Sequence, residues 1–359
     1  MKLAIAGDVS VTESNEKYFA EQNVKILFND VPSVWKNCDR VIVNLETAIT
    51  DKNTPIKKFG PNLKAPFGTV ETLKEAGVTD LTLSNNHIFD FGKAGLKDTV
   101  SEIKKNGLSF TGIGENYLDS RKNLVLSDGK IKVAIINVCE HEFSYALDDR
   151  VGARPYDEYD TPSDVEQAKK QNDYVIVIYH GGKEHCQYPS PRLHKLCHAL
   201  VNHGADVILC QHSHCIGCYE KYLDGHILYG QGNFHFVYDE KTSRQKNLKP
   251  FWHQGLVAII TLERDVKIEF VACKDNGTGI ELLKGREKEI LTKEFNERNQ
   301  MMKDGTFLSG WREFCHQPTY YDGIVKEGKE ALFAHFLDCE AHSDVLRELF
   351  PTYNLTNEK

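Results

Sequence analysis

Residues 173–184 read Asp-Tyr-Val-Ile-Val-Ile-Tyr-His-Gly-Gly-Lys-Glu, and residues 204–214 read Gly-Ala-Asp-Val-Ile-Leu-Cys-Gln-His-Ser-His. In each stretch an apolar, β-branched run ends in histidine beside small or polar residues. Buried strands of α/β sheets present their chemistry at their carboxyl ends, where ligands gather. His212 and His214 are two residues apart, so they share one side of an extended chain. Because histidine is the commonest metal ligand, His180, His212 and His214 together indicate a metal site.

The composition indicates a globular protein that works in a reducing compartment. The chain has 359 residues, of which 40% are hydrophobic and 27% charged, and its formal net charge is −8. This negative balance, without a basic stripe, argues against binding to nucleic acid. The ten cysteines lie in apolar or helix-like stretches, so we expect free thiols and a cytoplasmic location. We expect no signal peptide and no membrane segment, because no apolar run is long enough to cross a bilayer.

Strand-like and helix-like patterns alternate through the first part of the chain. We expect strands over 3–6, 40–46, 80–84 and 108–111 and in the runs that end at His180 and His212, hairpins over 123–138 and 219–229, and helices over 69–77, 95–106, 162–171 and 191–203. This alternation predicts a layered α/β domain over residues 1–240 whose hairpins make the sheets mixed. Residues 241–359 are expected to add a hairpin that completes a sheet, followed by a mainly helical subdomain.

The ends of the predicted strands carry residues that bind metals or transfer protons: Asp8, Glu46, Asn86, His87, His180, His212 and His214. Taken singly, each has an ordinary explanation as a turn residue or a hydrogen-bonded core histidine. Five apolar strands that each end in such a residue are hard to attribute to turns. Two carboxylates, three imidazoles and an amide suffice to hold two divalent cations, with one carboxylate bridging them.

The same residues belong to motifs that resemble the bacterial capsule-synthesis CapA family, the poly-γ-glutamate biosynthesis group of the calcineurin-like metallophosphoesterase superfamily. The motifs are Ala6-Gly7-Asp8, Asn44-Leu45-Glu46, Ser84-Asn85-Asn86-His87, Asp90-Phe91-Gly92, Gly112-Ile113-Gly114-Glu115-Asn116, His180-Gly181-Gly182-Lys183-Glu184, Gly204-Ala205-Asp206, His212-Ser213-His214, Glu220 and Gly232-Asn233-Phe234. They follow the order and spacing of the family from residue 1 to about 238. The resemblance does not extend to the C-terminal region.

The resemblance implies a four-layer α-β-β-α sandwich of two mixed sheets, with a dinuclear centre at one edge and a helical C-terminal appendage. It implies that Asp8 and His214 bind the first metal, that Glu46 bridges, that Asn86, His180 and His212 bind the second metal, and that His87 donates a proton to the reacting group. One residue departs from the pattern: Ser10 stands where the superfamily usually has a histidine. The number of ions, one or two, and their identity, Mn, Fe or Zn, therefore stay open.

Further residues near these motifs are candidates for supporting roles. Asp90 and Glu184 could orient imidazoles from outside the ligand shell, although a solvated turn acid explains each equally well. Asn233 is a candidate of the same kind. Arg154 lies beside the site loops and could hold a phosphate or carboxylate.

Three functions are consistent with the sequence. The first is a CapA-like hydrolase of phosphoesterase type that uses a metal-activated water on a small or polymeric substrate bearing phosphate or carboxylate, in capsule, poly-γ-glutamate or other cell-surface polymer synthesis. The second, motivated by Ser10, is a non-catalytic binding or assembly subunit that keeps the metal-binding fold. The third is a structural zinc protein built on Cys215 and Cys218, which form a C-x-x-C pair, together with Cys210 and the two neighbouring histidines. The oligomeric state stays open, with a homo-oligomer as one option.

Overall fold

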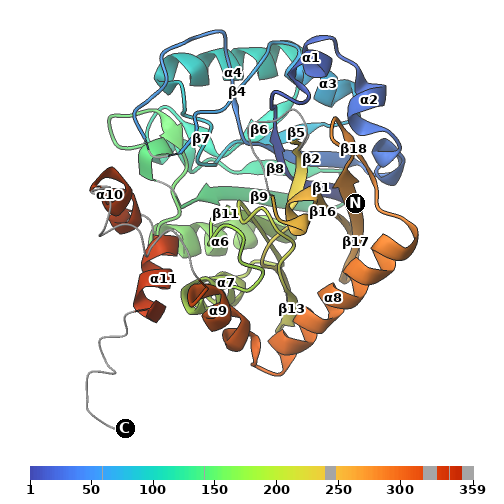
Figure 1. Cartoon of the computed structure of the whole chain (residues 1–359), viewed down its shortest axis with the longest axis vertical. Coiled ribbons are helices and arrows are strands. Elements are labelled where there is room, and N and C mark those ends of the chain that lie inside the picture. Colours follow the sequence, from blue (N-terminus) through green and yellow to red (C-terminus); the bar gives the residue numbers. More distant parts are fainter. Residues whose placement is uncertain (59, 141, 239–247, 318–329, 339, 350–359) are drawn as a thin grey trace.

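Two mixed β-sheets lie face to face and carry helices on their outer sides (Figure 1). The structure, a computed structural model, describes residues 1–58, 60–140, 142–238, 248–317, 330–338 and 340–349. The first sheet has the order β18-β17-β16-β1-β2-β5-β6, and β15 also pairs with β1. The second has the order β13-β14-β12-β11-β9-β8. Both contain parallel and antiparallel pairs, so the prediction of two mixed sheets is confirmed.

The strands of the first sheet are β1 (Lys2–Ser10), β2 (Arg40–Leu45), β5 (Asp80–Thr82), β6 (Ser109–Thr111), β15 (Asn233–Phe236), β16 (Gln254–Leu262), β17 (Val266–Asp275) and β18 (Ile280–Leu282). Those of the second are β8 (Leu124–Ser127), β9 (Lys132–Cys139), β11 (Tyr174–His180), β12 (Val207–Gln211), β13 (Tyr219–Tyr222) and β14 (Gly225–Leu228). Two small pairs join β3 (Ala48–Ile49) to β4 (Lys64–Ala65) and β7 (Ile113–Gly114) to β10 (Gly152–Ala153).

The helices are α1 (Glu16–Ala20), α2 (Val24–Phe28), α3 (Thr69–Glu75), α4 (Gly92–Asn106), α5 (Tyr117–Ser120), α6 (Asp160–Gln171), α7 (Pro191–Asn202), α8 (Gly285–Lys303), α9 (Phe307–Cys315), α10 (Glu330–Asp338) and α11 (Glu340–Leu349). Short 3-10 turns are η1 (Val31–Val34), η2 (Glu142–Ser144) and η3 (Pro250–His253). Every helix in the described part of the chain is too short or too polar to cross a lipid bilayer.

Three hydrophobic cores separate four layers. Between the sheets, Ile5 of β1 and Ile178 of β11 belong to one buried cluster. A second cluster joins the first sheet to α1–α4, and a third joins Val177 of β11 to Val165 of α6 and Leu196 of α7. The sheets are covered on both faces, which is why their central strands read as continuous apolar runs. The predicted α-β-β-α sandwich is therefore confirmed.

Two predicted helices begin earlier than expected: α4 begins at Gly92 instead of residue 95, and α6 begins at Asp160. We expected a helix over 162–171 with its cap at Thr161, whereas α6 begins at Asp160. The Asp157 carboxylate accepts hydrogen bonds from the backbone N–H groups of Tyr159 and Asp160, each at 2.8 Å. These bonds satisfy donors that the start of a helix leaves free, so the helix begins earlier.

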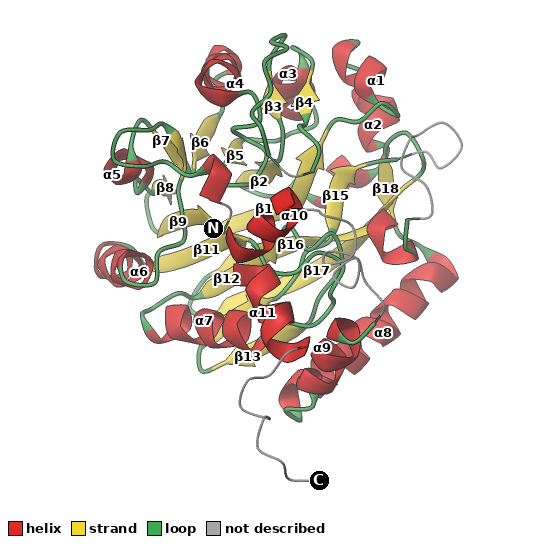
Figure 2. Cartoon of the chain, turned by 60° about the vertical axis from the view of Figure 1, so that its left-hand side comes forward, coloured by secondary structure: helices red, strands yellow, loops and turns green. Residues whose placement is uncertain are grey.

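The C-terminal part of the chain packs on the body in two ways. Strands β16–β18 extend the first sheet beyond β1. Helix α11 lies beside α7 in Figure 2, where Asp344 accepts hydrogen bonds from Ser190 at 2.7 Å and Arg192 at 3.0 Å. The predicted boundary between residues 240 and 241 lies outside the described residues, so the division into two units stays a prediction.

Candidate metal centre

The carboxyl ends of β1, β2 and β11 meet at one edge of the sandwich. Strands β1 and β2 are parallel, with Asp8 opposite Asn44, and β11 ends at His180. Gly7 allows this approach, because a Cβ atom there would lie 2.7 Å from the carbonyl oxygen of Gly232. The loop after β12 brings His212 to the same place, where its backbone N–H donates to Asp8 Oδ2 at 3.0 Å.

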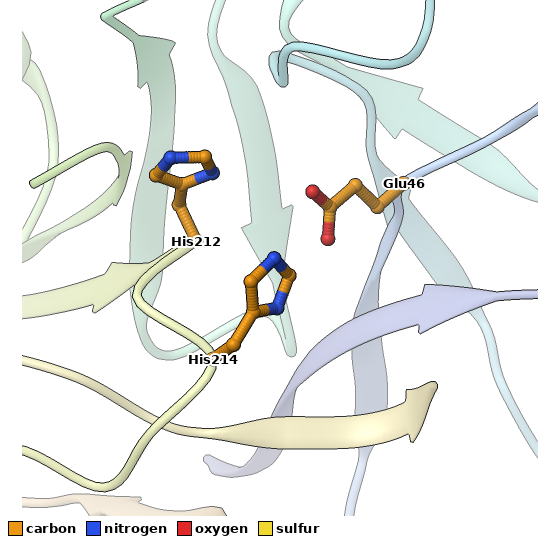
Figure 3. Close-up of side chains that lie close together, drawn as sticks. All are labelled: Glu46, His212 and His214. Atoms are coloured by element: carbon orange, nitrogen blue, oxygen red, sulfur yellow. The ribbon is translucent and has the colours of Figure 1, made fainter. Parts of the chain in front are cut away.

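Glu46 is the central carboxylate of this edge. It is 0% exposed, and neither of its oxygens accepts a hydrogen bond from any described residue. Its carboxylate belongs to two groups of potential ligands, one with Asp8 and His180 and one with His212 and His214. In each group the ligand atoms lie within 4.8 Å of one another. Figure 3 shows the Glu46 carboxylate facing the rings of His212 and His214.

His180 lies between the two buried carboxylates. Its Nδ1 is 3.6 Å from Asp8 Oδ1, and its Nε2 is 3.4 Å from Glu46 Oε1 and 2.8 Å from Asn86 Oδ1. Burial alone would lower the pKa of His180, but the neighbouring carboxylates of Glu46 and Asp8 raise it to about 9. Burial alone would raise the pKa of Asp8, yet His180 holds that pKa below its ordinary value. The two buried carboxylates thus need positive charge at this point.

His214 is held by a partner outside the cluster. Its Nδ1 lies 2.8 Å from Asn233 Oδ1, and Asn233 Nδ2 donates to the Trp252 carbonyl at 2.9 Å. The Asn233 oxygen can only accept, so His214 carries its proton on Nδ1 and its Nε2 is available as a ligand. His212 and His214 both have left-handed backbone conformations, with φ of 80° and 53°. Such strain at non-glycine residues is concentrated at functional sites.

His87 belongs to a separate buried network. Its Nδ1 lies 2.7 Å from Asp90 Oδ2 and 3.2 Å from Lys58 Nζ, and its backbone N–H donates to Asn85 Oδ1. The Lys58 side chain is only 2% exposed and pairs with Asp90. Burial lowers the pKa of His87, and the Lys58 charge lowers it further against the opposing effect of Asp90.

The structure brings most of the predicted residues together, but not all of them. Arg154 is buried, and its guanidinium donates to Asn123 at 2.8 Å and to Asp164 at 2.6 Å, so its contacts do not support a grip on phosphate or carboxylate. Glu184 is 42% exposed at its side chain, with its Oε1 3.8 Å from His212 Nε2. Ser10 is buried at the end of β1, and no described residue hydrogen-bonds its hydroxyl.

The contacts do not divide the ligands between two ions. His180 contacts Asp8 and Asn86, its ring centroid lies 5.0 Å from that of His212, and both groups of potential ligands share Glu46. Among the described residues, no cysteine joins a group of side chains that could hold a metal, which does not support the third alternative, a zinc site on Cys215 and Cys218. The roles assigned to individual ligands stay predictions.

Three supporting residues were not predicted from the sequence. Asn44 donates to Asp8 Oδ1 at 2.7 Å, and Asn85 donates to Asn44 Oδ1 at 3.0 Å, so two amides hold the carboxylate in place. Both occur within the quoted motifs, which was the available signal. Lys58 lies in the polar stretch 51–66, outside every quoted motif, so the sequence did not single it out.

Comparisons with known proteins agree with these motifs. The family described as bacterial capsule synthesis protein PGA_cap matches residues 2–238. The capsule biosynthesis protein CapA of Bacillus anthracis is 30% identical over 256 residues, covering 69% of this chain and 62% of that protein. The PGA biosynthesis protein CapA of Bacillus subtilis (strain 168) is 28% identical over 255 residues, covering 69% and 66%. The chain thus matches less than two thirds of the length of either relative. Among solved structures, a 5'-nucleotidase precursor from Thermus thermophilus gives a TM-score of 0.45 at 12% identity, covering 85% of this chain and 59% of that one.

Proposed function

The chain belongs to the bacterial capsule synthesis protein family, and on that premise we propose that it is a metal-dependent hydrolase of phosphoesterase type. Its substrate is a compound bearing phosphate or carboxylate in the synthesis of capsule or poly-γ-glutamate. The observation that carries the proposal is Glu46, a fully buried carboxylate shared by two groups of potential metal ligands.

The residues present fit a divalent cation. Glu46 has two buried oxygens that accept no hydrogen bond from the described residues, and His180 Nε2 lies 3.4 Å from one of them. A divalent cation would offset the cost of burying this carboxylate. Asp8, His180, His212 and His214 supply the oxygen and nitrogen donors that Mn, Fe or Zn accept. When bound at such a site, a divalent metal supplies a Lewis acid and lowers the pKa of water toward neutrality.

The remaining chemistry belongs to the chain itself. Asp90 accepts from His87 Nδ1, which fixes the ring and leaves Nε2 as the nitrogen that exchanges a proton with the reacting group. Lys58 places a buried positive charge beside His87 and pairs with Asp90, so it helps to hold the Asp90 and His87 side chains in place. Asn85 holds the backbone of His87 and, through Asn44, is connected to Asp8, so the two parts of the site are positioned together.

Ser10 favours a second candidate, a non-catalytic subunit of a polymer synthesis machinery. The residue is a buried serine whose hydroxyl has no described hydrogen-bond partner, where the superfamily pattern has a histidine ligand. A site with one ligand fewer can bind metal for structural reasons and leave the substrate unchanged.

The test is metal analysis of the purified chain combined with a panel of phosphoesters and γ-glutamyl compounds. We expect bound divalent metal, hydrolysis of at least one phosphoester, and, in Glu46→Gln, loss of turnover together with a lower metal content. His87→Ala should retain the metal and lose about 10²–10⁴-fold in kcat, the usual contribution of a general acid or base. His203→Gln, an exposed histidine at the end of α7, is the matched control and should behave as wild type.

Each other outcome has a definite meaning. Metal retention without turnover on any compound of the panel would contradict the hydrolase and support the non-catalytic subunit. A protein that takes up no divalent metal, or one whose turnover is unchanged in Glu46→Gln, would overturn the proposal.

A further inference from the structure

A second group of metal-binding side chains lies between α7 and β13, apart from the centre around Glu46. His194 and His198 are four residues apart on α7, so they share one face of the helix. Glu220 on β13 faces them. The ligand atoms of these three residues lie within 4.8 Å of one another.

We propose that His194, His198 and Glu220 form a second divalent-metal site, of the kind that binds Zn²⁺. Two imidazole nitrogens and one carboxylate are an established donor set for zinc. Metal–ligand bonds of about 2.0–2.2 Å place the donors of a tetrahedral site roughly 3.3 Å apart. His194 Nε2 is 3.6 Å from Glu220 Oε1, close to that spacing. His198 Nε2 hydrogen-bonds the same oxygen and would need to move away slightly to admit the ion.

The surroundings hold these donors in place. Tyr229 donates its hydroxyl to Glu220 Oε1 at 2.9 Å. The ring of Tyr222 stacks on the ring of His198, with centroids 3.6 Å apart, and the ring centroid of Phe307 lies 4.7 Å from that of His194. Partners outside the ligand shell that fix ring orientation strengthen metal binding.

Exposure and charge also suit a metal. The side chains of His194, His198 and Glu220 are 26%, 22% and 12% exposed, so an ion can enter and water can complete its coordination. A glutamate carboxylate is charged at neutral pH and attracts a cation.

The sequence around the pair argues for a structural rather than a hydrolytic role. Zinc proteases of the H-E-x-x-H type carry a glutamate next to the first histidine as general base, and here that position is Lys195. A metal here would join α7 to the hairpin of β13 and β14. Because β14 pairs with β12, the strand that leads to His212, the ion would brace the sheet behind the centre.

The test is zinc titration of the chain carrying Glu46→Gln, which weakens the first centre. We expect about one equivalent of Zn²⁺ to bind, and His198→Gln in the same background to lower the affinity at least roughly tenfold, by loss of one ligand. The matched control is His203→Gln at the end of the same helix, where the ring is exposed. It should leave the affinity unchanged. An equal affinity for Zn²⁺ in His198→Gln and in the control would overturn the proposal. The contacts between Glu220 and the histidines would then be hydrogen bonds without a role in metal binding.

A second measurement needs no variant. Diethyl pyrocarbonate modifies accessible imidazoles, and mass spectrometry locates the modified residues in the wild-type chain. Zinc should protect His194 and His198 and leave His203 reactive. Equal modification of all three with and without zinc would overturn the proposal even if a variant failed to fold.

Discussion

Replacement of Asn233 by alanine should weaken metal binding without removing a ligand. Asn233 Oδ1 lies 2.8 Å from Nδ1 of the buried His214, and this contact fixes the proton on Nδ1. In Asn233→Ala the ring can turn or move its proton to Nε2, which then no longer binds a metal. Loss of such a partner typically lowers metal affinity about 10–100-fold.

The hydrogen bond itself gives a similar magnitude. A buried donor left without its acceptor costs about 1–3 kcal/mol. A 10–100-fold change in affinity corresponds to about 1.4–2.7 kcal/mol, so the two figures agree. Asn233→Asp retains an oxygen acceptor for His214 and should lose less affinity than Asn233→Ala.

The assay is competition for Zn²⁺ or Mn²⁺ with a chromophoric chelator, in a chain that also carries His198→Gln so that only the centre around Glu46 is measured. Circular dichroism should first establish that each variant is folded. An affinity of Asn233→Ala within about twofold of its parent would refute the reasoning, because it would mean that His214 needs no partner or is not a ligand.

Three further predictions concern stability and can be measured by urea unfolding. Burial lowers the pKa of His235 from 6.5 to about 4, so as pH falls the unfolded chain takes up a proton at this residue before the folded protein does. This costs the folded protein about 2 kcal/mol of stability between about pH 7 and pH 5. His235→Gln should abolish that part of the pH dependence, and an unchanged pH dependence would contradict this. Gly7→Ala should destabilise the fold by about 1–3 kcal/mol, because the added methyl group would lie too close to the carbonyl oxygen of Gly232. A urea midpoint equal to that of the wild type would be inconsistent with this clash. Arg154→Met should cost about 1–3 kcal/mol, since Asn123 and Asp164 lose a buried donor while Asp164 keeps Arg121, yet leave metal affinity unchanged. A selective loss of substrate binding would restore the role first expected of Arg154.

The sequence predicted the layers because the strands are buried on both faces. The run 174–179 is apolar or aromatic throughout and is followed directly by His180. Both the strand and its functional end can therefore be recognised from the sequence. Parallel strands bring such ends to one edge, which is why Asp8 and Glu46, at the ends of the neighbouring strands β1 and β2, could be expected together.

What the sequence did not reveal depends on contacts between distant elements. Lys58 lies in a polar loop outside the motifs, and its burial beside Asp90 becomes visible only in the folded structure. The pairing of His180 with Asp8 depends on how strands from two different sheets face each other. His194 and His198 read as the polar face of a helix until the position of β13 brings Glu220 against them.

The central claim is that Glu46 binds a divalent cation together with histidines from the second sheet. It is tested most directly by anomalous diffraction at the zinc edge from crystals of the chain grown with Zn²⁺. We predict an anomalous peak within about 2.0–2.2 Å of a Glu46 carboxylate oxygen and of at least one of His180, His212 and His214. A structure in which both Glu46 oxygens contact only protein or water, with no anomalous peak beside them, would contradict the account.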